Sequence, residues 1–173
     1  DMIYETIDRY ISQVKAMREC GFDGVNIHMC YRFTMAARFL SPMTNVRTDE
    51  FGGSLENRMR FAKLLCGGIK KACGKDFLIE VTISGHDPVE DGWTIQDSIT
   101  FSKEMKGLVD IMTVRASRLD PQHPTGYEEK KRPWAYMAEE IKKGGPEIKV
   151  AASSGLFDPD ANEAILAAGK ADL

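Results

Sequence analysis

The sequence predicts an α/β protein with a parallel sheet, and three observations support this fold class. Short segments rich in Val and Ile alternate along the chain with longer segments whose apolar residues recur at helical spacing. Strands joined through helices pair in parallel, because the crossover returns the chain to the same end of the sheet. The longest connections follow the predicted strands, and no Gly-x-Gly-x-x-Gly occurs after any of them.

The first predicted helix carries apolar side chains at helical spacing over residues 7–17 and ends at Gly21. Residues 22–28 follow as a short strand. Successive side chains of a strand point to opposite faces, so Asn26 and His28 share one face and the intervening apolar residues share the other. The strand therefore ends with a titratable ring on its polar face.

The rest of the chain repeats this alternation of helix and strand. Ser54 is a good N-cap for the second helix, which Gly74 ends, and Thr94 with Asp97 forms a capping pair that opens the third. The predicted elements after Gly74, in chain order, are a strand at 77–84, a helix at 94–108, a strand at 109–115, a helix at 133–143, a strand at 148–153 and a helix at 158–168.

Two architectures satisfy this alternation, an open doubly wound sheet and a (β/α)8 barrel. Long loops after the strands favour the barrel, whose catalytic face is built from such loops. A full barrel takes about 250 residues, but this chain has 173 residues. Ala171-Asp172-Leu173 looks like the lead-in to another strand. We therefore expect residues 1–173 to form a single partial barrel domain, about half of a barrel, as a fragment of a longer protein.

Composition excludes several function classes. An apolar fraction of 43% and a charged fraction of 28% indicate a soluble globular protein, which we expect in the cytoplasm. The net charge of −3 gives no electrostatic case for nucleic acid or an anionic membrane. No apolar run approaches the roughly 20 residues needed to span a bilayer, and the first residues do not resemble a signal peptide. The 4 cysteines lack metal-binding spacing and predict reduced thiols and no metal site.

The segment Leu40–Phe61 is the most distinctive part of the sequence, because a long loop rich in charged residues runs directly into a helix. We expect its polar residues, from Asn45 to Glu50, to fix the loop by charge-assisted hydrogen bonds, with Gly52-Gly53 turning the backbone into the helix. Direct contact of these residues with a substrate is the alternative.

The whole chain resembles the old yellow enzyme family of FMN-dependent oxidoreductases, in particular bacterial NADH:flavin oxidoreductases of the 2,4-dienoyl-CoA reductase type. The resemblance rests on four segments, which occur in this order: GFDGVNIH, FLSPMTNVRTDEFGGSLENRMRF, DFLIEVTISG and SSGLFDPDANEAILAAGKADL. It implies a (β/α)8 TIM barrel with FMN at the carboxyl ends of the strands, of which this chain spans strands 4 to 7.

The resemblance also implies the reaction and its cofactors. Hydride passes from NADH or NADPH through FMN to the activated C=C bond of an unsaturated carbonyl or acyl-CoA-like substrate. An iron–sulfur cluster would be held by cysteines outside this chain. The alternatives are a drifted, flavin-poor homologue or fragment without activity of its own and, more remotely, another phosphate-binding barrel enzyme such as a lyase. Alone, the chain is expected to lack stoichiometric FMN and to self-associate through open sheet edges.

Two residues match or replace the family's catalytic groups. His28 matches the family's carbonyl-binding residue, since an imidazole N–H can donate to an oxygen that gains negative charge. The family's proton-donating Tyr is replaced by Phe33, and Tyr31 is the neighbouring candidate for the proton donor or for a second hydrogen bond. A strand-end histidine with a structural role and a tyrosine that only packs at the barrel mouth are the competing interpretations.

Cofactor-binding residues are implied on three further strands. Thr82 stands where the family has an arginine that faces the flavin ring, and Arg115 is a candidate to supply the missing charge. Alternatively, Arg115 pairs with Glu80 inside the barrel or faces solvent. Ser154-Gly155 match the family's small-residue turn, whose backbone N–H groups meet the FMN phosphate close to the start of the last helix. An ordinary strand-to-helix turn is the alternative there.

Overall fold

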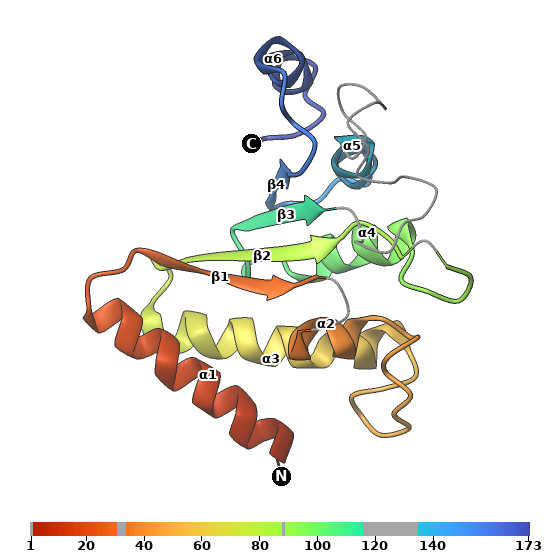
Figure 1. Cartoon of the computed structure of the whole chain (residues 1–173). Helices are drawn as coiled ribbons and strands as arrows, with labels where there is room; N and C mark the ends of the chain where they lie inside the picture. Colours follow the sequence, from red (N-terminus) through yellow and green to blue (C-terminus); the bar gives the residue numbers. More distant parts are fainter. Residues whose placement is uncertain (1, 31–33, 88, 116–134) are drawn as a thin grey trace.

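A computed structural model describes residues 2–30, 34–87, 89–115 and 135–173. Four strands alternate with helices along these residues (Figure 1). In chain order the elements are α1 (Met2–Glu19), β1 (Gly24–Met29), α2 (Met35–Leu40), α3 (Leu55–Cys73), β2 (Leu78–Ser84), α4 (Ile95–Glu104), β3 (Ile111–Arg115), α5 (Ala135–Lys143), β4 (Lys149–Ala152) and α6 (Pro159–Ala167).

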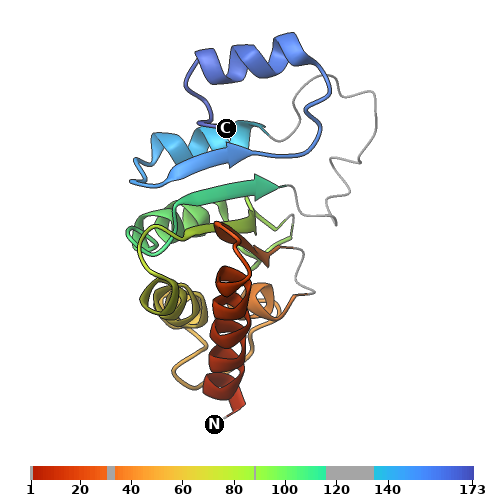
Figure 2. The same ribbon diagram turned by 90° about the vertical axis from the view of Figure 1, so that its left-hand side faces the viewer.

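The strands form one parallel sheet in the order β1-β2-β3-β4. This order decides between the two architectures that the sequence allows. A doubly wound sheet reverses its strand order at a switch point, whereas a barrel adds each new strand beside the last. The arrowheads of β1, β2 and β3 point the same way. Helices α1 and α3 lie on the β1 side of the sheet, and α6 lies beyond β4 on the other side (Figures 1 and 2). The described strands are therefore an arc of a barrel.

Alternate residues of each strand bury an apolar face against the helices. In β2 these residues are Ile79, Val81 and Ile83, each no more than 1% exposed, and they share one core with Leu65 of α3 and Phe101 of α4. The opposite face carries polar residues, which are Asn26 and His28 of β1, Glu80 and Thr82 of β2, and Thr113 and Arg115 of β3. We call this set the polar face.

The helix ends follow the caps that the sequence predicts. Ser54 accepts a hydrogen bond from Asn57 N, and Thr94 with Asp97 forms a complete capping box. Gly74 ends α3 with a φ of 91°, a conformation that glycine adopts without steric cost. Two expectations fail. Helix α4 ends at Glu104 rather than at 108, and the short α2 was not predicted.

The segment Leu40–Phe61 packs in the helix layer, and its polar residues fix the loop by hydrogen bonds. Asn45 Nδ2 donates to the carbonyl oxygens of Phe39 and Phe51, each at 2.7 Å. Arg47 pairs with Asp49, whose pKa is lowered by that hydrogen bond and by the Phe51 N–H. A Cβ on Gly52 would lie 2.2 Å from the Arg47 carbonyl oxygen, so the turn into α3 needs glycine at that position.

The last residues of the chain pair with β4. Asp172 N donates to Val150 O at 2.7 Å, and Ala152 N donates to Leu173 O at 3.0 Å. These two backbone hydrogen bonds hold the residues after α6 beside β4, but no fifth strand is formed among the described residues.

Candidate active site

The predicted site residues on three strands and one turn lie at a single edge of the sheet. His28 is next to last in β1, Thr82 lies near the end of β2, Arg115 ends β3, and Ser154-Gly155 follow β4. Carboxyl ends of parallel strands meet at one edge, which is where ligands of α/β barrels bind. Tyr31 and Phe33 lie outside the described residues.

His28 and Thr82 are direct neighbours on the polar face, because the β1–β2 register pairs them. Thr82 is 5% exposed, and its Oγ1 accepts a hydrogen bond from Asn26 Nδ2 at 2.9 Å. On the described part of the sheet, the position at which the family resemblance implies an arginine therefore holds a neutral pair of polar side chains.

Arg115 and Glu80 have separate partners. Arg115 Nε donates to Ser154 Oγ at 3.2 Å, across the space between β3 and the turn after β4. Glu80 Oε1 instead accepts a hydrogen bond from Thr113 Oγ1 at 2.5 Å. The predicted alternative of a Glu80–Arg115 pair is wrong, because Arg115 lies at the rim in register with Ser84, whereas Glu80 lies deeper, in register with Ile111.

The turn after β4 has an uncommon backbone. Ser154 has a φ of 81° and Gly155 a φ of 72°, so a side chain and a glycine occupy the left-handed region in succession. Such a conformation is uncommon for residues other than glycine and is found preferentially at ligand-binding sites. The start of α6 is already capped, since Asp158 Oδ1 accepts hydrogen bonds from Asp160 N and Ala161 N.

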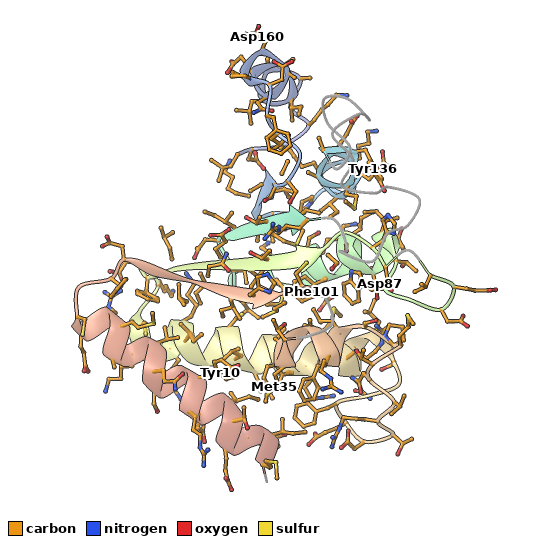
Figure 3. The ribbon with its side chains drawn as sticks, in the orientation of Figure 1. Tyr10, Met35, Asp87, Phe101, Tyr136 and Asp160 are labelled. Atoms are coloured by element: carbon orange, nitrogen blue, oxygen red, sulfur yellow. The ribbon has the colours of Figure 1, made fainter. Side chains whose placement is uncertain are left out.

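Sequence reasoning missed a buried polar network directly behind this edge. Asp87 follows β2 and accepts hydrogen bonds from Ser41 Oγ at 2.7 Å and Trp93 N at 3.1 Å. Trp93 Nε1 donates to Ser98 Oγ, which in turn donates to Gly85 O. Asp87 lies beyond the end of β2 in Figure 3. A Ser-Pro and an Asp-Gly-Trp at loop positions were the available signals, but only the fold brings them together.

Two more contacts at this end of the sheet were not predicted. Cys30, which is fully buried, lies with its Sγ 3.1 Å from Ser84 Oγ. His86 is half-buried and has its Nε2 2.8 Å from the hydroxyl of Tyr136, in the first turn of α5 (Figure 3).

All 4 cysteines are free thiols, and burial raises the pKa of Cys66 to about 12. Among the residues that the structure describes, no three His, Cys, Asp or Glu side chains gather closely enough to hold a metal ion. None of the described helices is long and apolar enough to cross a membrane.

Comparison with known sequences identifies the lineage of this arrangement. The family model for NADH:flavin oxidoreductases and NADH oxidases matches residues 1–173. The chain is 32% identical over 176 residues to an NADH oxidase of Thermoanaerobacter brockii, covering 99% of the chain and 26% of that protein. It is also 32% identical over 177 residues to the NADPH dehydrogenase of Bacillus subtilis strain 168, covering 100% of the chain and 49% of that protein.

A solved structure of 2-naphthoyl-CoA reductase in complex with 2-naphthoyl-CoA shares the fold, with a TM-score of 0.88 and 29% identity, covering 99% of this chain and 26% of that one. The structural relatives are TIM barrels, so the (β/α)8 class predicted from the sequence is confirmed. The chain spans from about a quarter to about half the length of the relatives that it matches.

Proposed function

Because this chain belongs to the NADH:flavin oxidoreductase / NADH oxidase family, we propose that its strand ends bind FMN and that the whole protein reduces the C=C bond of an α,β-unsaturated carbonyl compound, with NADH or NADPH as reductant. One observation carries the proposal. His28, Thr82, Arg115 and the 154–155 turn, each implied by the family resemblance, lie on neighbouring strands at the carboxyl edge of one parallel sheet.

The residues present fit a flavin nucleotide best at its phosphate end. The turn at Ser154-Gly155 has the left-handed backbone that lets a chain approach a ligand closely, and a guanidinium lies beside it. At the level of the ring the polar face offers His28 and the Asn26–Thr82 pair, which can donate hydrogen bonds but carries no full charge.

Bound FMN would supply the hydride chemistry, since a flavin can take a hydride from NADH or NADPH and deliver one to an activated C=C bond. His28 donates an N–H to the carbonyl oxygen of the substrate, and this bond strengthens as negative charge develops there. Tyr31 delivers the proton to the α-carbon, the role for which Phe33 lacks a transferable hydrogen. The apolar core behind the sheet keeps the strand ends fixed while these groups act.

The substrate class follows from the same relatives. The solved reductase named above holds an aryl-CoA thioester, and a thioester carbonyl is an oxygen of the type that His28 would polarise. We therefore place acyl-CoA-like and simple unsaturated carbonyl compounds together as substrates.

The test uses the purified full-length protein. We expect the yellow absorbance of oxidised flavin, its bleaching by NADH or NADPH without oxygen, and saturated product from 2-cyclohexenone or an aryl-acrylyl thioester. His28→Ala should retain flavin but lower kcat/KM by about 10²–10³-fold, as loss of one oxyanion-type donor does. His86→Ala removes a half-buried histidine at the same end of the sheet and serves as the matched control. A full-length protein that binds no flavin would refute the proposal.

A second candidate, a flavin-poor homologue without ene-reductase activity, is favoured by the neutral Asn26–Thr82 pair where the family resemblance implies a cation. Reduced flavin gains negative charge, which a neighbouring arginine would stabilise. Flavin content of the full-length protein separates the two candidates.

A further inference from the structure

Glu80 places a carboxylate on the interior face of the barrel. It is the third residue of β2, is half-buried, and shares the polar face with Thr82, two residues further along the strand. The hydroxyl of Thr113 donates to Glu80 Oε1 at 2.5 Å. Burying a carboxylate beside a neutral partner costs free energy, and no step of the proposed reaction uses Glu80.

The hydrogen bond from Thr113 draws this carboxylate toward the carboxyl ends of the strands. The strand registers place Glu80 beside Asn26. One step higher they place Thr82 between His28 and Thr113, and we call these three residues the upper row. Two residues of a strand rise about 6.6 Å, so Glu80 starts one step below the upper row. Because its Oε1 bonds Thr113 Oγ1, the carboxylate reaches the underside of that row.

The lysine and the arginine of the described strands lie away from this carboxylate. Lys149 of β4 starts at the same depth as Glu80, since both are in register with one residue of β3, but its Nζ lies 3.7 Å from Asp172 Oδ1. Arg115 ends β3 one step above the upper row, where it bonds the turn after β4. On the described strands, the titratable groups at the upper row are therefore the carboxylate of Glu80 and the ring of His28.

A negative charge below the upper row would act on a flavin ring at that level. Reduced flavin carries more negative charge than oxidised flavin, so a carboxylate repels the reduced form more strongly. Thr82 offers a hydroxyl but no positive charge to offset this repulsion, and its Oγ1 bonds the neutral amide of Asn26. Coulomb interactions are strong in the interior of a barrel, because the effective dielectric constant is far below that of water.

We propose that Glu80 lowers the reduction potential of the bound flavin, which makes the flavin a stronger hydride donor to the substrate and a poorer hydride acceptor from NADH or NADPH. The inference rests on the proposed function and adds to it a residue that does not touch the substrate. Thr113 is then the positioning residue that holds the carboxylate against the upper row. A stronger hydride donor suits a C=C bond that is harder to reduce, such as one conjugated with an aromatic ring.

The experiment measures the reduction potential of FMN in the full-length protein, by equilibration with dyes of known potential. Glu80→Gln keeps the size of the side chain and an oxygen that accepts from Thr113, but removes the charge. It should tighten reduced FMN relative to oxidised FMN about tenfold, which raises the potential of this two-electron couple by about 30 mV. Thr113→Val keeps the charge but releases the carboxylate, and should raise the potential by less. Glu104→Gln removes an exposed carboxylate of α4 that pairs with Lys63 outside the barrel, and should leave the potential unchanged.

The two half-reactions give a second readout by stopped-flow absorbance. NADH should reduce the flavin of Glu80→Gln faster than that of the wild type, and 2-cyclohexenone should reoxidise it more slowly. Equal slowing of both half-reactions would indicate altered packing rather than altered potential, and the proposal would then be wrong.

An unchanged or lowered potential in Glu80→Gln would overturn the proposal and leave the proposed function standing, because flavin is still bound and reduced. Lys149→Met tests whether a lysine neutralises Glu80 in the whole barrel. It should shift the potential less than Glu80→Gln does, since its ammonium lies beside Asp172. An equal and opposite shift would refute the role of Glu80. A full-length protein that binds no flavin would remove both proposals, so failure of the proposed function is recognised before any potential is measured.

Discussion

Replacing Arg58 by methionine should destabilise the protein strongly, although Arg58 lies outside the candidate site. Arg58 is only 7% exposed, and its guanidinium donates to the carbonyl oxygens of Leu40 and Gly53. Its Cζ lies 5.8 Å from the centre of the Trp93 ring, and its Nη2 lies 4.0 Å from an oxygen of Asp97. Arg58 thus ties both ends of the loop between α2 and α3 to the loop after β2.

The magnitude follows from these contacts. A hydrogen bond from a charged donor to a buried carbonyl contributes about 1.5–3 kcal/mol, and a desolvated cation–π contact about 1–2 kcal/mol. Burial lowers the pKa of Arg58, which shows that its charge is desolvated, and removing the charge regains part of that cost. Methionine retains most of the apolar stem. The net loss is therefore about 2–3 kcal/mol, or a fall in Tm of about 4–12 °C for a domain of this size.

The assay is thermal and urea unfolding of Arg58→Met beside Arg38→Met. Arg38 is an exposed arginine in the last turn of α2, so the same chemical change there should shift stability by no more than about 0.5 kcal/mol. Hydrogen exchange should show faster exchange at the Asn45 and Phe51 amides in Arg58→Met. If the two variants unfold at the same temperature, the reasoning about Arg58 is refuted.

Three further predictions follow from contacts elsewhere in the molecule. Burial acts to raise the pKa of Asp172, but the Val150 N–H and the Lys142 ammonium outweigh it and lower the pKa below its usual value. The stability that Asp172 contributes is therefore present above its unfolded pKa of about 3.9 and is lost as pH falls through the folded pKa. Urea unfolding across this pH range should show a smaller loss of stability on acidification in Asp172→Asn than in the wild type. Gly67→Ala should stabilise α3 by about 0.5–1 kcal/mol, because its new Cβ would lie 3.7 Å from Leu108, whereas Gly68→Ala places a Cβ 2.2 Å from Ile11 Cδ1 and should be the less stable of the two by thermal melting. The 173-residue chain expressed alone should self-associate, because an open groove of about 320 Å³ between α1 and β1 exposes apolar side chains beside an edge strand; light scattering that finds a monomer at all concentrations would contradict this.

The sequence predicts the strands and helices well because their signals are local. Ser54, Thr94 and Gly74 act on backbone groups within four residues of themselves, and their caps form where they were predicted. Helix α2 escaped prediction because six residues are too few to show a helical period. Helix α4 stops early since Met105 to Leu108 form a turn that Gly107, with a φ of 73°, permits.

The sequence predicts which residues lie together at the carboxyl ends of the strands, but it does not predict which of their side chains are in contact. Strand alternation places Glu80, Thr82 and Arg115 on the polar face, and all three are found there. The partner of Arg115 depends on the stagger between β3 and the turn after β4, which no local pattern encodes. For the same reason the burial of Arg58 was missed, since a lone arginine in a helix pattern predicts an exposed side chain.

The most distinctive segment of the sequence and the chemistry of the protein are therefore separable. Residues 40–61 pack on α1 through the Tyr4–Phe51 contact and on α2 through the Phe39–Phe61 contact, on the apolar side of the sheet. Arg58 and the Ser41–Asp87 bond link this segment to the loop after β2, so it acts on the strand ends only by holding their loops in place. The residues of such a scaffold are fixed by packing, so the scaffold does not depend on which residues occupy the strand ends. That is why the segment identifies the family, whereas Thr82, which departs from the family pattern, has to be judged by flavin binding.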